Sequence, residues 1–123
     1  MREHCESCEP FGLTDDISTE HAHLMLDFYC RTLKELSYDP VPFDDLDTKV
    51  GENRFSTPKY DALTHAHWMV HQTRAFLQQG RMAKAYRWIG MIQGILFMNG
   101  IFSLAELKRH NRFDLPTVRP RGR

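Results

Sequence analysis

The sequence predicts an all-α protein, a small helical bundle with two long helices, an apolar central helix and a short capped C-terminal helix. Two observations carry this prediction. Apolar residues recur at spacings of three and four along three segments, which is the period of an amphipathic helix. Capping residues, prolines or glycines also bound these segments. A chain of 123 residues has the size of a single domain.

The first helix is expected over residues 19–36, after an irregular arm at residues 1–17. Ser18 or Asp16 can cap it by accepting a hydrogen bond from the N–H groups of the first turn. Its apolar face is predicted from residues at helical spacing, namely Ala22, Met25, Leu26, Tyr29, Leu33 and Leu36.

An acidic loop is expected over residues 37–57, where Pro40, Pro42, Gly51 and several aspartates interrupt the helical pattern. A loop of this length in a small domain is often functional or mobile. The alternative is a solvated connection that apolar side chains hold to the core, and these are Val41, Phe43, Leu46 and Phe55.

The second long helix is expected to begin at Thr57-Pro58, a capping threonine followed by a proline at the first helical position. It should end near Gln79, because Gly80 follows. The next helix starts at once, at Arg81 or Met82, and so short a connection makes an antiparallel hairpin. One stripe of the second long helix is predicted to comprise Tyr60, Leu63, His67, Val70, Arg74 and Leu77, with Ala66, Met69, Thr73 and Phe76 beside it.

The central helix is expected to be apolar on both sides, since Gln93 is the one polar side chain between Trp88 and Met98. One arc comprises Met82, Ala85, Ile89, Ile92 and Leu96, and the opposite arc Trp88, Met91, Ile95 and Met98. A helix that is apolar all round must be covered all round. It is therefore the centre of the bundle or packs against a second subunit, and we expect a homo-oligomer.

Gly90 and Gly94 lie four residues apart on one stripe of this helix. A glycine inside a helix costs about 1 kcal/mol relative to alanine. We therefore expect a neighbouring helix to approach the backbone closely there, in preference to a ligand.

The end of the central helix is predicted at Asn99-Gly100, a left-handed C-cap. Ser103 and Glu106 then form a capping box, with Phe102 and Leu107 in the positions of a hydrophobic staple. A short helix should run from Leu104 to about His110. Residues 113–123 should be a basic tail with little structure.

The cysteines supply a zinc half-site without an evident second half. Cys5 and Cys8 have the Cys-x-x-Cys spacing, and Cys30 is the one later cysteine. His21 and His23 can complete such a site in space, but half-sites without a matching pair are usually false. Without a signal-like apolar stretch near the N-terminus, we expect a cytoplasmic protein with reduced cysteines and no membrane segment.

Two histidines of the second long helix form a second metal-binding candidate. His67 and His71 stand four residues apart, so both imidazoles lie on one helix face and can chelate an ion. The glutamate of the H-E-x-x-H motif is missing. A histidine on a half-apolar helix more commonly packs through a hydrogen bond, and we expect no bound metal and no cofactor.

The charges divide between the two halves of the chain. Residues 1–61 carry fourteen acidic and six basic side chains, a net charge of −8, whereas residues 62–123 carry two and ten, a net charge of +8. The halves can neutralise each other, or the basic half can bind an anionic partner.

Basic and aromatic residues gather around the start of the central helix. Arg81, Lys84 and Arg87 adjoin Trp88, and the hairpin brings Arg74 near. Guanidinium groups with an aromatic ring can hold a phosphate and stack a base. The alternative is a solvated basic face whose side-chain stems pack over Trp88. No nucleotide fingerprint or nucleophile motif occurs, so we expect a non-enzymatic protein.

A family resemblance covers residues 64–112, about two-fifths of the chain. It rests on the order His67-Trp68-Met69, Gly80-Arg81, Lys84-Ala85, Arg87-Trp88-Ile89-Gly90, Gln93-Gly94, Gly100, Leu107-Lys108 and Asn111-Arg112. This pattern resembles the C-terminal half of a set of small phage and prophage accessory proteins. The resemblance implies a counter-defence protein that acts in the cytoplasm of the bacterial host by binding and inhibiting a host protein.

Two alternatives remain open, a sponge that sequesters a nucleotide second messenger and a nucleic-acid-binding module. The predicted ligand- or partner-binding residues are Arg74, Arg81, Lys84, Arg87, Trp88, Trp68, His67, Asn111 and Arg112. The inhibitor would use the charged faces and the acidic loop, the sponge Arg81, Lys84, Arg87 and an aromatic ring, and the nucleic-acid module the basic half. Gln93, in apolar surroundings, must find hydrogen-bond partners, and Asn111 and Arg112 can fold back to supply them.

Overall fold

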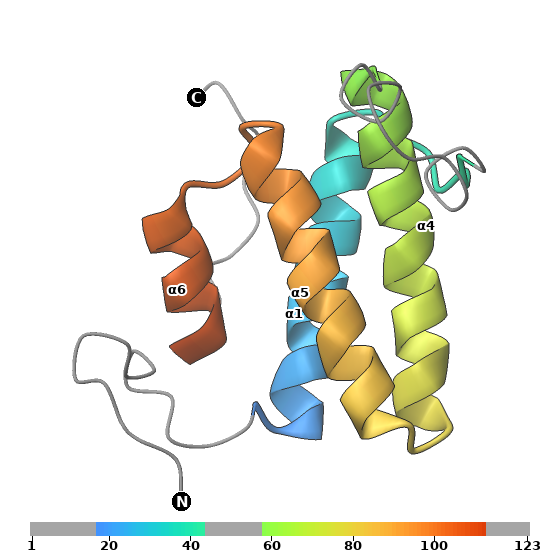
Figure 1. The fold of residues 1–123 in the computed structure, drawn as a ribbon, viewed down its shortest axis with the longest axis vertical. Helices are drawn as coiled ribbons and strands as arrows, with labels where there is room; N and C mark the ends of the chain where they lie inside the picture. Colours follow the sequence, from blue (N-terminus) through green and yellow to red (C-terminus); the bar gives the residue numbers. More distant parts are fainter. Residues whose placement is uncertain (1–16, 44–57, 113–123) are drawn as a thin grey trace, which may run out of the picture.

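The computed structural model describes residues 17–43 and 58–112, which form four α-helices and contain no strand. These are α1 (Thr19–Glu35), α4 (Lys59–Gln78), α5 (Met82–Met98) and α6 (Leu104–Arg112), shown in Figure 1. The predicted all-α fold is confirmed. The predicted basic tail, most of the N-terminal arm and most of the acidic loop lie outside the described residues.

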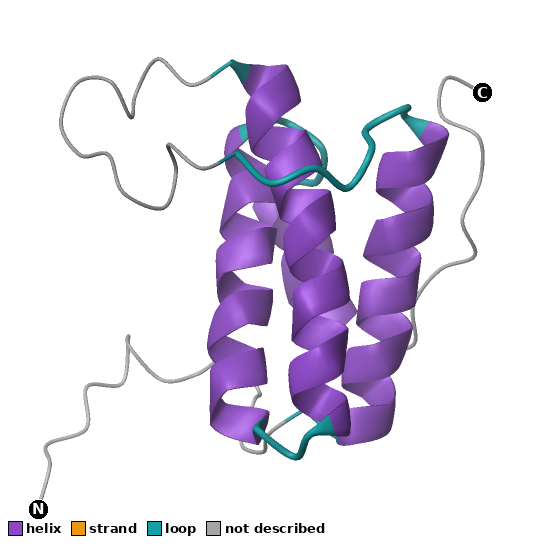
Figure 2. Cartoon of the chain, turned by 90° about the vertical axis from the view of Figure 1, so that its right-hand side faces the viewer, coloured by secondary structure: helices purple, strands orange, loops and turns teal. Residues whose placement is uncertain are grey.

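Consecutive helices run antiparallel along one common direction (Figures 1 and 2). Side-chain contacts show that α1 touches each of the other three. Its Cys30 contacts α4, and its Tyr29 contacts both α5 and α6. The side of α1 that carries Tyr29 is fully buried as a result.

The core is built from the apolar faces that the helical spacing predicts. Fully buried positions come from three helices, namely Ala22, Met25, Leu26, Tyr29 and Leu33 from α1, Leu63, Ala66 and Val70 from α4, and Ala85, Ile92 and Leu96 from α5. Leu107 adds the apolar side of α6 to the same cluster. Burial of these side chains drives the helices together, because each large aliphatic or aromatic group contributes about 1.5–3 kcal/mol when it leaves water.

The helix ends follow local capping chemistry. The Ser18 hydroxyl accepts from the His21 N–H at the start of α1. Gly80 and Gly100 close α4 and α5 with positive φ angles of 78° and 75°, which a residue with a Cβ rarely adopts. Before α6, the backbone N–H of Glu106 donates to the Ser103 hydroxyl and the Glu106 carboxylate accepts from the Ser103 N–H, as expected for a capping box.

Helix boundaries differ from the prediction by one or two residues. Pro58 is the N-cap of α4, with an extended ψ of 144°, so the helix begins one residue later, at Lys59. Thr57, its predicted cap, lies outside the described residues. The short α6 continues to Arg112 instead of ending near His110. Contacts of its last turn with α1 and α5, described below, account for the extension.

One side of α5 remains uncovered by the described residues. Of its second apolar arc, Trp88 and Ile95 are half-buried, whereas Met91 and Met98 are 58% and 77% exposed. Gly90 and Gly94 are exposed as well, and a Cβ built on either would meet no atom within 4 Å. The close helix approach expected at these glycines therefore does not occur among the described helices.

Candidate functional site

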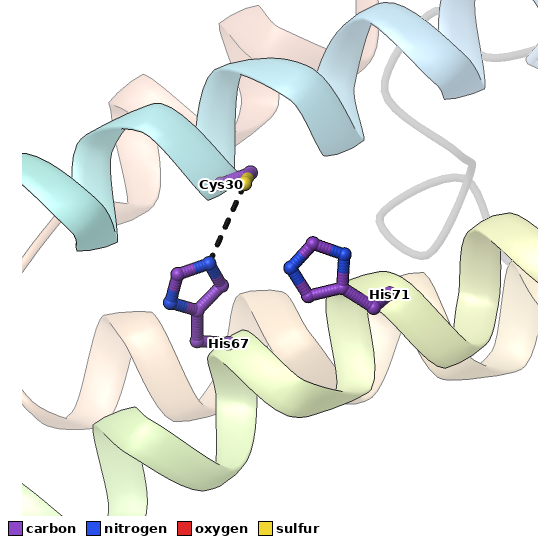
Figure 3. Close-up of side chains that lie close together, drawn as sticks. All are labelled: Cys30, His67 and His71. Carbon is purple, nitrogen blue, oxygen red and sulfur yellow. Dashed lines mark hydrogen bonds between the residues drawn. The ribbon is translucent and has the colours of Figure 1, made fainter. Parts of the chain in front are cut away.

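The first candidate site lies between α1 and α4. Cys30 projects from α1 toward His67 and His71, which stand one turn apart on α4 (Figure 3). Each residue offers one potential ligand atom, and these three atoms lie within 4.8 Å of one another. The Cys30 Sγ and the His67 Nε2 are 3.4 Å apart. The arrangement places one sulfur and two imidazole nitrogens around a single point.

A backbone carbonyl fixes the orientation of His67. Its Nδ1 lies 2.6 Å from the carbonyl oxygen of Tyr38, which can only accept, so Nδ1 carries the proton. Its Nε2 then presents a lone pair to Cys30. The chain reverses at Ser37, with a φ of 72°, and the Tyr38 N–H donates to the Leu33 carbonyl. The end of α1 thus holds the carbonyl in place.

His71 is the exposed member of the cluster. Its ring stacks on that of His67 with centroids 5.2 Å apart and an angle of 25° between the planes. Partial burial lowers the pKa of His71, and the neighbouring His67 and Arg74 lower it further. Its imidazole is therefore neutral at pH 7 and keeps an available lone pair.

A polar network lies between α1, α5 and α6. The amide nitrogen of Gln93 donates both of its protons, to the Tyr29 hydroxyl and to the Asn111 side-chain oxygen, each at 2.9 Å. Because the Tyr29 hydroxyl accepts from Gln93, its own proton can go to the His110 Nδ1, 2.8 Å away, in the tautomer that protonates the ring at Nε2. Burial raises the pKa of Tyr29, and the Gln93 hydrogen bond offsets part of that rise, so the hydroxyl stays protonated. Asn111 supplies a partner to Gln93 as predicted, while Arg112 is exposed at the end of α6.

The predicted basic and aromatic group is organised around Phe76. The Arg81 guanidinium and the Lys84 ammonium lie 5.3 and 4.7 Å from the centre of its ring. Trp88 meets the same ring edge-on, at 4.9 Å between centroids, and lies 6.2 Å from Trp68. Arg81 and Lys84 therefore both lie over the ring of Phe76.

The remaining predicted residues lie elsewhere. Arg74 pairs with Asp27 of α1, at 2.5 Å between Nη2 and Oδ1. Arg87 is exposed on the outer side of α5. His67 belongs to the cysteine–histidine cluster and Asn111 to the polar network. The nine predicted binding residues therefore do not form one site.

Sequence reasoning missed Cys30 as the partner of the two histidines. A usable signal was present, because Cys30 follows the core residue Tyr29 and therefore borders the buried face of α1. The position of Cys30 along α1 does not determine which neighbouring helix its side chain faces. The pairing depends on the crossing of α1 and α4.

Comparison with known proteins adds no identification. No protein-family model matches the chain, and neither a curated protein nor a solved structure matches it significantly. Among the described helices, none combines the length and the apolar character needed to cross a membrane.

Proposed function

We propose that the protein is a non-enzymatic phage accessory protein that binds a host protein on the outward face of α5 and inhibits it. The uncovered side of α5 carries this proposal. Met91 and Met98 stand exposed there, beside two glycines whose Cβ positions are open. Exposed apolar side chains gathered on one helix face favour a protein contact over solvent.

The chemistry of this face suits a partner helix. Glycines without neighbours allow another backbone to come close, and they cost helix stability without a compensating contact inside the described residues. Methionine side chains are flexible and polarisable, so they adapt to the shape of an apolar partner. The exposed Phe97, on the same helix, adds a larger apolar anchor.

Charge defines the partner more closely. No acidic residue occurs between Asp61 and Glu106, whereas Arg81, Lys84 and Arg87 lie at the N-terminal end of α5. The expected partner surface is therefore apolar, with carboxylates placed to meet this basic end. Its assignment to the bacterial host, and the outcome as counter-defence, rest on the resemblance to phage accessory proteins.

The experiment is capture from host lysate with paired variants of the immobilised protein. Met91→Asp combined with Met98→Asp should abolish capture, because two carboxylates would be buried against an apolar partner that already carries acidic groups. Leu24→Asp is the matched control, since Leu24 is 52% exposed on α1. It should leave capture unchanged.

Several results would count against the proposal. Capture that survives the paired α5 substitutions would place the contact elsewhere. A dimer in light scattering that the same substitutions convert to a monomer would show that the expected homo-oligomer forms on this face, in place of the host contact. A co-purified nucleotide detected by native mass spectrometry and lost on Arg87→Ala would favour the sponge. Strongly salt-sensitive DNA binding would favour the nucleic-acid-binding module.

A further inference from the structure

We propose that Cys30, His67 and His71 bind a divalent transition-metal ion, and that the ion is Zn²⁺. The proposal is independent of the α5 surface, because these three residues join α1 to α4. It rests on the convergence of three ligand atoms from two helices within 4.8 Å of one another (Figure 3).

The spacing of the ligand atoms agrees with a tetrahedral ion. Zinc–sulfur and zinc–nitrogen bonds of about 2.3 and 2.05 Å place a sulfur and a nitrogen about 3.6 Å apart at the tetrahedral angle. The Cys30 Sγ and the His67 Nε2 are 3.4 Å apart. The remaining separations are at most 4.8 Å, and a small rotation of the exposed His71 side chain can shorten them.

The surroundings of His67 are those of a metal ligand. A ligating histidine usually donates its second N–H to a carbonyl or carboxylate, which fixes the tautomer and orients the ring. The Tyr38 carbonyl fills this role at 2.6 Å from Nδ1. The unprotonated Nε2 consequently faces the cluster before any ion binds. The ring therefore loses little orientational entropy on binding.

The donor set selects the metal. One thiolate and two imidazoles suit zinc and related borderline ions, whereas calcium and magnesium require oxygen ligands. On binding, the Cys30 thiol releases its proton to solvent and its sulfur forms the metal–sulfur bond. Three protein ligands leave one tetrahedral position for a water molecule.

The test uses the full chain with Cys5 and Cys8 replaced by serine, so that Cys30 is the only thiol. After chelator treatment under a phosphine reductant, the protein is titrated with Co²⁺ as a spectroscopic probe and then with Zn²⁺. We expect one equivalent of Co²⁺ to produce a thiolate-to-metal charge-transfer band and the visible bands of tetrahedral cobalt. One equivalent of Zn²⁺ should remove both and raise the Tm.

Single substitutions assign the ligands. Cys30→Ser should eliminate the charge-transfer band, and His71→Ala should weaken Zn²⁺ binding at least about tenfold. Because His71 is exposed, its removal should leave the fold intact, and circular dichroism checks this. His23→Ala, a partly exposed α1 histidine outside the cluster, is the control and should bind as the parent does. Absence of the charge-transfer band, or binding unchanged in both Cys30→Ser and His71→Ala, would overturn the proposal.

Discussion

The phenolic oxygen of Tyr29 on α1 lies 2.8 Å from the Nδ1 of His110 on α6, although 81 positions of the chain separate them. The His110 ring is packed between aromatic neighbours, meeting Phe28 and Phe102 edge-on with centroids 5.1 and 4.8 Å away. The short α6 is therefore anchored to the core by a polar contact inside an aromatic cluster. A buried acceptor in such surroundings depends strongly on its donor.

Removing the Tyr29 hydroxyl should destabilise the fold. Tyr29→Phe leaves the His110 Nδ1 buried without a donor, and we expect a loss of about 1–3 kcal/mol in the free energy of unfolding, measured with urea. Tyr60→Phe is the control, because Tyr60 is exposed on α4 and should change stability by less than about 0.5 kcal/mol. Equal effects of the two substitutions would contradict the role assigned to the buried hydrogen bond.

Stability should fall on mild acidification. Burial lowers the pKa of His110 and nearby His21 lowers it further, while Glu106 raises it in part. Below the ordinary histidine pKa, His110 binds a proton in the unfolded chain but not yet in the folded protein. This proton binding stabilises the unfolded state relative to the folded state. The free energy of unfolding should therefore decrease as pH falls through that value and level off below the folded pKa.

Replacing His110 with asparagine isolates its share of this pH dependence. An asparagine oxygen can still accept the Tyr29 hydrogen bond, but it does not titrate. Urea unfolding of His110→Asn at several pH values should show a shallower slope than the parent protein. The slope should not vanish, because the pKa of His71 is lowered too. A slope identical to that of the parent would exclude His110 as its source.

The capping box formed by Ser103 and Glu106 should stabilise the folded protein. Ser103→Ala removes the acceptor for the Glu106 N–H and should cost about 1 kcal/mol in unfolding free energy. Ser103→Gly should cost only a few tenths of a kcal/mol, since glycine is tolerated at an N-cap. Thermal denaturation should therefore give the highest Tm for the parent, a slightly lower one for Ser103→Gly and the lowest for Ser103→Ala. Equal Tm values for both variants and the parent would show that the cap contributes nothing.

Gly90 should reveal whether the α5 face serves binding. Gly90→Ala places a methyl group in open space within a helix, so it should stabilise the isolated chain by about 0.5–1 kcal/mol. The same methyl group should weaken capture of the proposed partner by blocking close backbone approach. Differential scanning calorimetry and the lysate capture described above measure the two effects. A stabilised variant that captures as well as the parent would remove the glycines from the interface.

Local sequence signals were sufficient for the existence of the helices and for most of their ends, to within one or two residues. Spacings of three and four predicted the buried faces of α1 and α5, and the Ser103–Glu106 capping box predicted the start of α6. These signals act within one or two helical turns, so they can be read without knowledge of the rest of the chain. Gln93 lies in an apolar stretch and must find hydrogen-bond partners. This requirement also predicted the approach of Asn111.

Contacts between distant helices required the packed structure. The meeting of Cys30 with the α4 histidines, the bond between Tyr29 and His110, and the seating of Lys84 on Phe76 depend on how the helices cross. Helical periodicity defines which residues share a face, but it does not select the neighbour that the face meets. Periodicity likewise predicts that α5 is apolar on both sides. Only the packing shows that the described helices leave the side of Met91 and Met98 uncovered.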